Sequence, residues 1–305
     1  MHLDNRLKKV FNSSMEVVFN DYDRFVFVSD CHRGDGTWAD NFSKNQNIFF
    51  AALTYYYHNK YTYIEIGDGD ELWENKKFLD ILNMHKDAFW LLSRFYDANR
   101  LYFIYGNHDI VKRDKKFVAE NLYRYFDRRE KQYIPLFEDI RVHEGLVLRH
   151  QNSGIRIFVV HGHQVDFFND RLWPLARFLS RYLWRPLESF GIKDPASPAK
   201  NYEKKQSIDH KLIQWVRKEN IMLIAGHTHR PMFPEVGEPA YFNDGSCVHP
   251  RCITAIEIEY GYIRLIKWSV KTKNDGSLYI GKDILAGPRR LMDYFPEEKQ
   301  VELPY

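Results

Sequence analysis

Phe25-Val26-Phe27-Val28-Ser29-Asp30-Cys31-His32 is the stretch of sequence that decides the fold. Four consecutive apolar residues are typical of a strand that is buried on both faces, and metal-binding side chains follow them at once. A short apolar run followed by a polar cluster recurs four more times, at residues 63–66, 101–105, 157–160 and 222–225. Helix-like segments lie between the early runs, including residues 78–95. The sequence therefore predicts an α/β fold.

The C-terminal part has a different pattern. Residues 253–258 alternate between apolar and polar, Tyr260-Gly261 follows, and residues 262–268 resume a strand-like pattern. This order predicts a β-hairpin with one face on a core. Together with the five apolar runs, it favours a two-sheet sandwich with flanking helices over a single open sheet.

Residues 165–219 fit neither pattern and predict two helices. The first has an apolar stripe at i, i+3, i+4, i+7 and i+11, made by Leu172, Leu175, Ala176, Leu179 and Leu183. Pro186 ends or kinks this helix, and Asp194-Pro195-Ala196-Ser197-Pro198 forms a loop. Apolar residues between 208 and 216 mark the second helix. We expect one domain over residues 1–305, with a helical cap inserted at about residues 165–219.

Composition limits the class of protein. The 305 residues are 44% hydrophobic and 28% charged, as in globular proteins, and 44 Lys+Arg against 41 Asp+Glu give +3. This charge does not suggest a nucleic-acid binder, and no apolar run approaches the roughly 18 residues of a membrane span. The N-terminus lacks the apolar stretch of a secretory signal, and three cysteines are too few for a disulfide framework. We therefore expect a cytoplasmic protein.

The polar cluster after each apolar run carries side chains that bind metals. The five clusters are residues 29–32, 67–71, 106–109, 161–163 and 226–229. Any one of them could be a turn or a helix cap, but strand ends converge on one rim of a sheet, where α/β proteins build their sites. Carboxylate, imidazole and amide ligands suit Mn²⁺, Fe or Zn²⁺. The ordered set predicts a metal site.

These clusters together resemble the calcineurin-like metallophosphoesterase superfamily. The matching motifs are Asp30-x-His32, Gly67-Asp68, Gly106-Asn107-His108, His161 and Gly226-His227-Thr228-His229. The resemblance implies a four-layer αββα sandwich with two divalent metal ions, of which Mn²⁺ is the first expectation and Fe or Zn²⁺ the alternatives. It assigns Asp30, His32 and His229 to the first ion and Asn107, His161 and His227 to the second, with Asp68 bridging both.

The resemblance also implies a mechanism. A hydroxide that bridges the two ions attacks phosphorus in line, and the ions neutralise charge on the phosphoryl oxygens. His108 stabilises the transition state or protonates the leaving oxygen, and Asp109 orients His108. Asn243-Asp244-Gly245-Ser246 resembles the segment that follows the last metal motif of the superfamily, where it forms a tight turn.

Three features resemble one branch, the UDP-2,3-diacylglucosamine pyrophosphatases of lipid A synthesis. They are the Gly-Asp-x-x-(acid)-x-Trp pattern at residues 67–73 with Glu71 at its acidic position, the Gly-His-Thr-His-Arg-Pro ending at residues 226–231, and a helical insertion where that branch carries its lipid-covering cap. Two residues depart from it: His108 stands where the branch has Arg, as in generic phosphoesterases, and His163 stands where it has Asp.

Several basic residues are candidates for substrate binding. Arg177, Arg181 and Arg185 repeat at i, i+4 and i+8 beside the apolar stripe. They could meet phosphate or an anionic membrane surface while the apolar side holds acyl chains. Alternatively, the leucines pack on the body of the protein and the arginines form a solvated face. His163 and Arg33 are further candidates, although Arg33 could equally form a salt bridge in its loop.

The expected function is metal-dependent hydrolysis of a phosphoester or pyrophosphate bond, best matched by the UDP-2,3-diacylglucosamine pyrophosphatases. The substrate is then a phosphorylated small molecule or a lipid-linked one, and the cap could contact the inner membrane surface peripherally. The alternative is a general phosphatase or phosphodiesterase for soluble phosphoesters or nucleotides. A non-catalytic scaffold predicts lost ligands, and every expected ligand is present.

Overall fold

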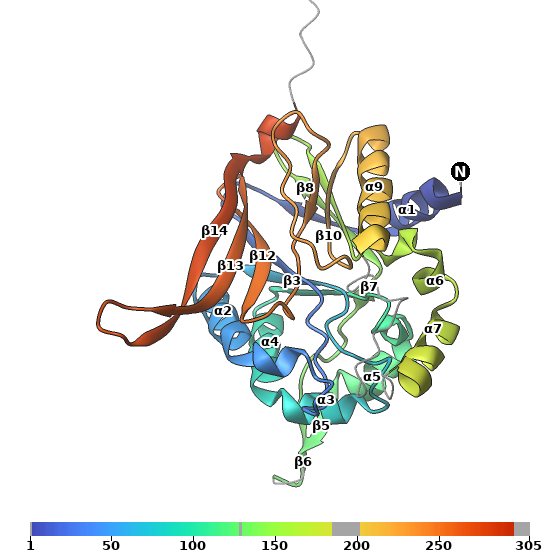
Figure 1. Cartoon of the computed structure of the whole chain (residues 1–305), viewed down its shortest axis with the longest axis vertical. Coiled ribbons are helices and arrows are strands. Elements are labelled where there is room, and N and C mark those ends of the chain that lie inside the picture. The colour runs from blue at the N-terminus through green and yellow to red at the C-terminus, as the bar shows by residue number, and fades with distance from the viewer. Residues whose placement is uncertain (1, 128–129, 185–201, 296–305) are drawn as a thin grey trace, which may run out of the picture.

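The computed structural model describes residues 2–127, 130–184 and 202–295. Two large β-sheets lie face to face, and helices cover the outer face of each sheet (Figure 1). The chain therefore has the four-layer αββα architecture expected from the sequence.

The first sheet has seven strands. Their bounds are β2 (Arg24–Val28), β3 (Thr62–Ile66), β4 (Leu101–Ile104), β7 (Val142–His143), β12 (Cys252–Glu259), β13 (Tyr262–Thr272) and β14 (Leu278–Arg290). The spatial order is β14-β13-β12-β2-β3-β4-β7. Strands β2, β3, β4 and β7 are parallel, whereas β12 pairs antiparallel with β2 and continues into β13 and β14. The predicted C-terminal hairpin thus extends the sheet that begins with residues 24–28.

The second sheet has five strands in the order β1-β8-β9-β10-β11. Their bounds are β1 (Met15–Phe19), β8 (Gly145–His150), β9 (Arg156–Val160), β10 (Met222–Ala225) and β11 (Tyr241–Asn243). Strands β9, β10 and β11 are parallel to one another. A separate hairpin is formed by β5 (Arg124–Asp127) and β6 (Gln132–Pro135).

Helices cover both outer faces. Their bounds are α1 (His2–Ser13), α2 (Gln46–His58), α3 (Phe78–Met84), α4 (Lys86–Asp97), α5 (Lys115–Asn121), α6 (Phe167–Asp170), α7 (Trp173–Leu179) and α9 (Tyr202–Glu219), and a π-helical turn, η4, spans Ser180–Trp184. In Figure 1, α1 and α9 lie beside β8 and β10, and α2 and α4 lie on the opposite side of the molecule.

Alternation within single strands builds the layers. In β2, Phe25 and Phe27 join the core between the two sheets, whereas Val26 and Val28 join the core under α2 to α5. Both faces of the strand are buried, which is why its sequence is continuously apolar. All five apolar runs that predicted buried strands are strands in the structure. The strands that were not predicted are β1, β5, β6, β7, β8, β11 and β14.

The predicted helix over residues 78–95 is two helices. Helix α3 ends and α4 begins on either side of His85, whose buried ring bonds Asp40 (Nε2 to Oδ2, 2.9 Å). The apolar pattern over residues 78–95 includes Trp90, but this side chain is 53% exposed.

The segment expected to form the cap differs from the sequence pattern. Helix α9 is present, and Ile208, Leu212, Trp215 and Val216 bury it against the five-stranded sheet, so this helix belongs to the outer layer of the sandwich. In the first half, α6, α7 and η4 replace one continuous helix. The expected stripe therefore does not pack as a unit: Ala176 is buried, but Leu172, Leu175 and Leu183 are exposed.

Three features of that segment lie outside the described residues: Arg185, Pro186 and the loop at 194–198. Whether residues 165–219 act as a cap stays a prediction. Among the residues that the structure describes, no helix is both long and apolar enough to cross a bilayer.

Candidate metal centre

The five polar clusters meet where β2, β3, β4, β9 and β10 end. Strands β2, β3 and β4 are parallel in one sheet, and β9 and β10 are parallel in the other. The residues that follow these five strands therefore gather at one rim. Five of the seven expected ligands have a left-handed backbone, with φ of 51° at Asp30, 47° at His32, 51° at Asp68, 69° at His227 and 53° at His229. Such conformations are strained in residues other than glycine and cluster at functional sites.

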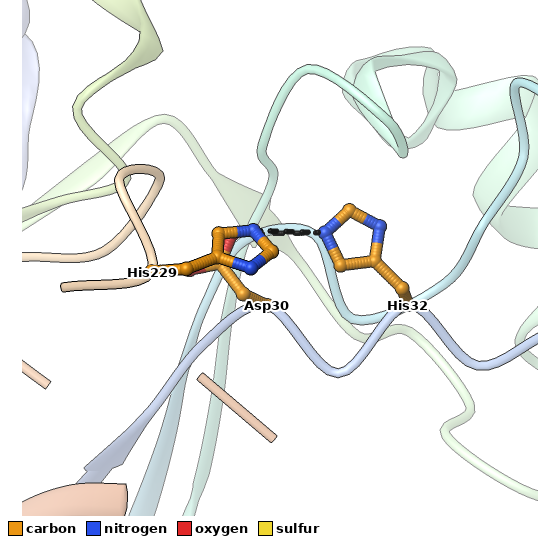
Figure 2. A group of neighbouring side chains, drawn as sticks. All are labelled: Asp30, His32 and His229. Atoms are coloured by element: carbon orange, nitrogen blue, oxygen red, sulfur yellow. Dashed lines mark hydrogen bonds and ion pairs between the residues drawn. The ribbon is translucent and has the colours of Figure 1, made fainter. Parts of the chain in front are cut away.

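The first group of ligand atoms comes from Asp30, His32 and His229. Asp30 Oδ1 lies 3.0 Å from His229 Nε2 and 3.7 Å from His32 Nε2, and the two histidine Nε2 atoms are 3.3 Å apart. Figure 2 shows the two rings with these nitrogens turned toward each other above Asp30. Residues from two distant loops thus present three ligand atoms to one point.

The second group comes from Asp68, His161 and His227. Asp68 Oδ2 lies 3.2 Å from His161 Nε2 and 3.8 Å from His32 Nε2 in the first group. This single carboxylate oxygen therefore faces both groups. That is the position expected for a ligand that bridges two ions.

The residues fit metal ions by their hydrogen bonding. Buried polar atoms almost always have a partner, yet Asp30 Oδ1, Asn107 Oδ1, His161 Nε2 and His227 Nε2 have no hydrogen-bond partner in the described structure. His161 Nδ1 donates to the carbonyl oxygen of Ile66 (2.7 Å), which leaves Nε2 as its free ligand atom. The close contacts of Asp30 Oδ1 and His161 Nε2 are with other expected ligands, His229 Nε2 (3.0 Å) and Asp68 Oδ2 (3.2 Å), so these oxygen and nitrogen atoms form a donor set for divalent ions.

The pKa values show how strongly these groups interact. Burial alone would raise the pKa of Asp30 and Asp68, but the imidazoles of His229 and His161 hold both well below their usual range. Burial alone would lower the pKa of His161, and Asp68 instead raises it to about 9. An ion that binds His161 would therefore displace a proton.

His108 lies at the edge of the centre with a partly exposed side chain. Its amide donates to Asp68 Oδ1 (2.7 Å), and its Nδ1 lies 2.8 Å from Glu71 Oε1. Because an ionised carboxylate only accepts hydrogen bonds, the His108 ring donates there. The Trp73 ring stacks on His108, with centroids 4.2 Å apart. The second Glu71 oxygen accepts from His32 Nδ1 (2.8 Å), so Glu71 orients two histidines.

Asp109 does not take the position that the sequence predicted, because Glu71 is the carboxylate that contacts the His108 ring. Asp109 instead accepts hydrogen bonds from the amides of Asp68 (3.2 Å), Gly69 (3.2 Å) and Gly106 (2.7 Å), and from Lys112 Nζ (2.7 Å). It therefore joins the two loops that carry Asp68 and Asn107. The Glu71 contact could have been suspected from the acidic position of its motif.

Arg33 is not placed to contact substrate. Its side chain is fully buried and forms a fork with Glu65 (2.8 Å to each oxygen) and a third bond from Nε to Asp70 Oδ1 (2.7 Å). The structure therefore agrees with the alternative prediction for Arg33, a salt bridge. This salt bridge is buried and does not lie within the loop of Arg33 itself.

The arginines of residues 177–185 have different environments. Arg181 donates to the carbonyl oxygens of Leu72 (2.9 Å), Trp73 (2.7 Å) and Asn75 (3.1 Å), which fixes η4 against the loop after Glu71. Arg177 is half-buried, and burial lowers its pKa together with the nearby charge of Arg181. Arg177 stays a candidate for binding an anion.

His163 is fully buried beside the second group, with ring centroids 5.4 Å from His161 and 6.4 Å from His227. Neither of its ring nitrogens has a hydrogen-bond partner in the described structure. Burial holds its pKa well below the usual range, so the ring is neutral. His163 therefore lies near the ligand atoms, and its substrate-binding role stays a prediction.

Two aspartates beside the centre were missed. Asp166 lies 3.7 Å from His227 Nε2 and also contacts Lys204 Nζ (2.8 Å). Asp244 and Asp30 both contact the Ser29 hydroxyl, which has a single hydrogen to donate. Burial and the charge of Asp30 hold the pKa of Asp244 well above its usual range. Asp166 lies in no motif, and Asp244 lies in the segment of residues 243–246, for which only a tight turn was expected.

Comparisons with known proteins identify the family of this chain. The sequence pattern of the calcineurin-like phosphoesterases matches residues 23–231. No curated protein gives a match. Two similar solved structures are Vps29 of Chaetomium thermophilum (9% identity, TM-score 0.40, covering 87% of this chain and 96% of that one) and a putative 5'-nucleotidase from Staphylococcus aureus in complex with alpha-ketoglutarate (13% identity, TM-score 0.35, covering 86% and 53%).

The chain spans about half the length of the second of these structures. Both likenesses are remote, whereas the family pattern covers most of the chain and includes every expected metal ligand. The chain belongs to the calcineurin-like phosphoesterase family and is a metal-dependent phosphoesterase.

Proposed function

We propose that the chain is a two-metal hydrolase of a phosphoester or pyrophosphate bond in a substrate with an apolar part, similar in activity to the UDP-2,3-diacylglucosamine pyrophosphatases. The observation that carries the proposal is the position of Asp68, whose Oδ2 faces His161 in one ligand group and His32 in the other. One carboxylate shared by two groups favours a pair of ions over a single ion.

Each ligand group has residues suited to one ion. Asp30, His32 and His229 would hold the first, and Asn107, His161 and His227 the second. Mn²⁺ is our first expectation, with Fe or Zn²⁺ as alternatives, because the ligands are carboxylate, imidazole and amide. Two such ions would neutralise charge on the phosphoryl oxygens and lower the pKa of a water nucleophile.

His108 is the residue that would move a proton. Burial alone would lower the pKa of His108, but the facing carboxylates of Glu71 and Asp68 more than offset this effect, so the pKa is raised and the protonated ring is favoured. Glu71 and Trp73 fix the ring, and its exposed edge is open to a ligand. His108 would donate a proton to the leaving oxygen, which contributes roughly 10²–10⁴-fold to the rate.

The segment from α6 to η4 supports an apolar part in the substrate. Arg181 fixes this segment beside Trp73, and large apolar side chains on it are exposed. These side chains are Phe167, Leu172, Leu175, Phe178, Tyr182 and Leu183. Acyl chains of a lipid-linked phosphate would find apolar contact here, and the same surface would allow peripheral contact with the inner membrane surface.

A general phosphatase or phosphodiesterase for soluble phosphoesters or nucleotides is the second candidate. His108 favours it, because generic phosphoesterases have His at this position whereas the pyrophosphatase branch has Arg. Arg181 also favours it, since three bonds to backbone carbonyls occupy its guanidinium and leave less of it for a phosphate.

A substrate panel separates the candidates. The chain is stripped with a chelator, reloaded with Mn²⁺, Fe²⁺ or Zn²⁺, and given UDP-2,3-diacylglucosamine, nucleotides, a chromogenic phosphodiester and phosphomonoesters. Metal-dependent release of UMP from the lipid alone would support the first proposal. Turnover of the soluble substrates alone would favour the second, and no turnover with any metal would leave a scaffold. His210→Ala, an exposed histidine on α9, is the matched control for variants of site histidines.

A further inference from the structure

Asp209 is a buried carboxylate on α9 that lies beneath the loop of residues 226–229. Its side chain is 3% exposed and sits on the helix face that Ile208 and Leu212 otherwise make apolar. Thr228 Oγ1 donates to Asp209 Oδ1 (3.2 Å), and the Tyr241 hydroxyl donates to the same oxygen (2.8 Å). An acid buried on an apolar face is costly unless its partners are fixed, so a specific role is expected.

These bonds close into a ring. The two hydrogens of Asn243 Nδ2 are shared among three acceptors: the carbonyl oxygen of Gly226 (2.7 Å), Thr228 Oγ1 (3.2 Å) and the Tyr241 hydroxyl (3.2 Å). Both hydroxyls therefore accept from Asn243 and donate to Asp209. The hydrogen of each hydroxyl must point at Asp209 for all of these bonds to form. Asp209 is thus the acceptor that fixes the orientation of both hydroxyls.

Thr228 lies between a ligand of one group and a ligand of the other. His227 belongs to the group of Asp68, and His229 belongs to the group of Asp30. Both histidines have a left-handed backbone, with φ of 69° and 53°. Conformations of this kind persist only where surrounding contacts impose them. The Thr228 side chain, fully buried between the two, supplies such a contact.

A second contact ties Asp209 to the same loop. Arg230, directly after His229, places Nη1 3.9 Å from Asp209 Oδ2. One carboxylate on α9 thus contacts residues on both sides of His229.

We propose that Asp209 is a positioning residue of the metal centre, which acts through Thr228 to hold His227 and His229 in the geometry that binds ions. The inference rests on the proposed function, because it assumes that both histidines are ligands. Removing supports of this kind typically weakens metal affinity 10–100-fold, on the order of the effect expected here.

Mn²⁺ titration of chelator-stripped protein by calorimetry tests the inference without any substrate. Asp209→Leu and Thr228→Val should each weaken Mn²⁺ binding by roughly 10–100-fold. Asp209→Asn keeps an acceptor oxygen and should restore most of the affinity lost in Asp209→Leu. Because both residues act in one chain of bonds, the double variant Asp209→Leu/Thr228→Val should bind no more weakly than the poorer single variant.

Glu257→Gln is the matched control. Glu257 is also a fully buried carboxylate, and it accepts a hydrogen bond from the Tyr56 hydroxyl (2.9 Å). It lies on β12, and none of its hydrogen bonds or ion pairs involves an expected metal ligand. This variant should lose stability and keep the Mn²⁺ affinity of the wild type. A general effect of damaged packing would instead weaken Mn²⁺ binding in both carboxylate variants.

Three outcomes would overturn the inference: wild-type affinity in a folded Asp209→Leu, wild-type affinity in Thr228→Val, or additive losses in the double variant. If Asp209→Leu does not fold, the Mn²⁺ affinities of Thr228→Val and Asp209→Asn still test the inference. A wild-type chain that binds neither Mn²⁺, Fe²⁺ nor Zn²⁺ would overturn the proposed function as well, so the two failures are distinct.

Discussion

Two adjacent sets of buried polar side chains satisfy their hydrogen bonds in opposite ways. The ligand rim consists of Asp30, His32, Asp68, Asn107, His161, His227 and His229. The ion-pair cluster consists of Arg33, Glu65, Asp70, Asp109 and Lys112, all buried. Four of the rim residues have a buried atom without a hydrogen-bond partner, whereas no side-chain atom of the cluster does.

The two sets differ in how their buried polar atoms are paired. In the cluster, Arg33 pairs with Glu65 and Asp70, and Lys112 lies 2.6 Å from Asp70 and 2.7 Å from Asp109. The chain thus pairs buried charges where only its own stability is concerned. An unsatisfied buried group costs about 1–3 kcal/mol, so the rim reduces the stability of the fold and keeps its atoms available for a ligand.

The largest effect is expected for Asp68→Asn. This change removes the negative charge that faces both ligand groups, so kcat/KM should fall by at least about 10³-fold and Mn²⁺ binding should weaken at both sites. Steady-state kinetics and calorimetric titration measure the two effects, with the exposed Asp80→Asn as control. Loss of affinity at one site alone would contradict the bridging position.

His108→Ala should lower kcat by roughly 10²–10⁴-fold, because it removes the proton donor. Its metal content should not change, since His108 contacts Asp68 through its amide and not through its ring. Metal analysis of the purified variant beside its kinetics checks both points, with His210→Ala as control. Activity equal to the wild type would exclude the assigned role.

In contrast to the variants of the ligand rim, Arg33→Met should mainly lower the stability of the fold. It leaves Glu65 buried without its cation and Asp70 with Lys112 alone, which costs about 3–5 kcal/mol of stability. Urea denaturation in the presence of chelator measures the loss, and Arg33→Lys, which keeps the charge but not the fork, should lose less. Wild-type stability combined with a raised KM would instead support contact between Arg33 and substrate.

The smallest effect is the acid sensitivity of the cluster. Burial alone would raise the pKa of Asp70, but Arg33 and Lys112 lower it to about 2. A pKa that is depressed in the folded state stabilises the fold above the unfolded value near 4, and this contribution is lost as the pH falls toward 2.

Wild type should therefore exceed Asp70→Asn by about 2 kcal/mol at neutral pH, and the gap should close as the pH falls below about 4. Urea denaturation between pH 7 and pH 3 measures the gap. A gap that stays constant over this range would show that Asp70 does not act through its charge.

The sequence predicts the rim much better than it predicts what supports the rim. Expected ligands such as Asp30, Asp68 and His227 follow directly after apolar strands, so each is suggested by a local pattern. The partners of Arg33 and Asp109 depend on loops that meet only in the fold: a salt bridge of Arg33 was one of two open alternatives without named partners, and Asp109 was expected to contact His108. Asp209 stands in a helical pattern that gives no sign of its contact with Thr228.

By itself, the sequence determined the α/β class, the five strands that carry the site and the residue types at their ends. These features follow from periodicity over a few residues, which is set by backbone geometry and burial. Only the tertiary structure decided that Glu71 and not Asp109 holds His108, that Arg33 is a core ion pair, and that α9 belongs to the outer layer. Each of these depends on contacts between residues far apart in the chain, because a buried charge or apolar face pairs with whatever the packing of the two sheets brings beside it.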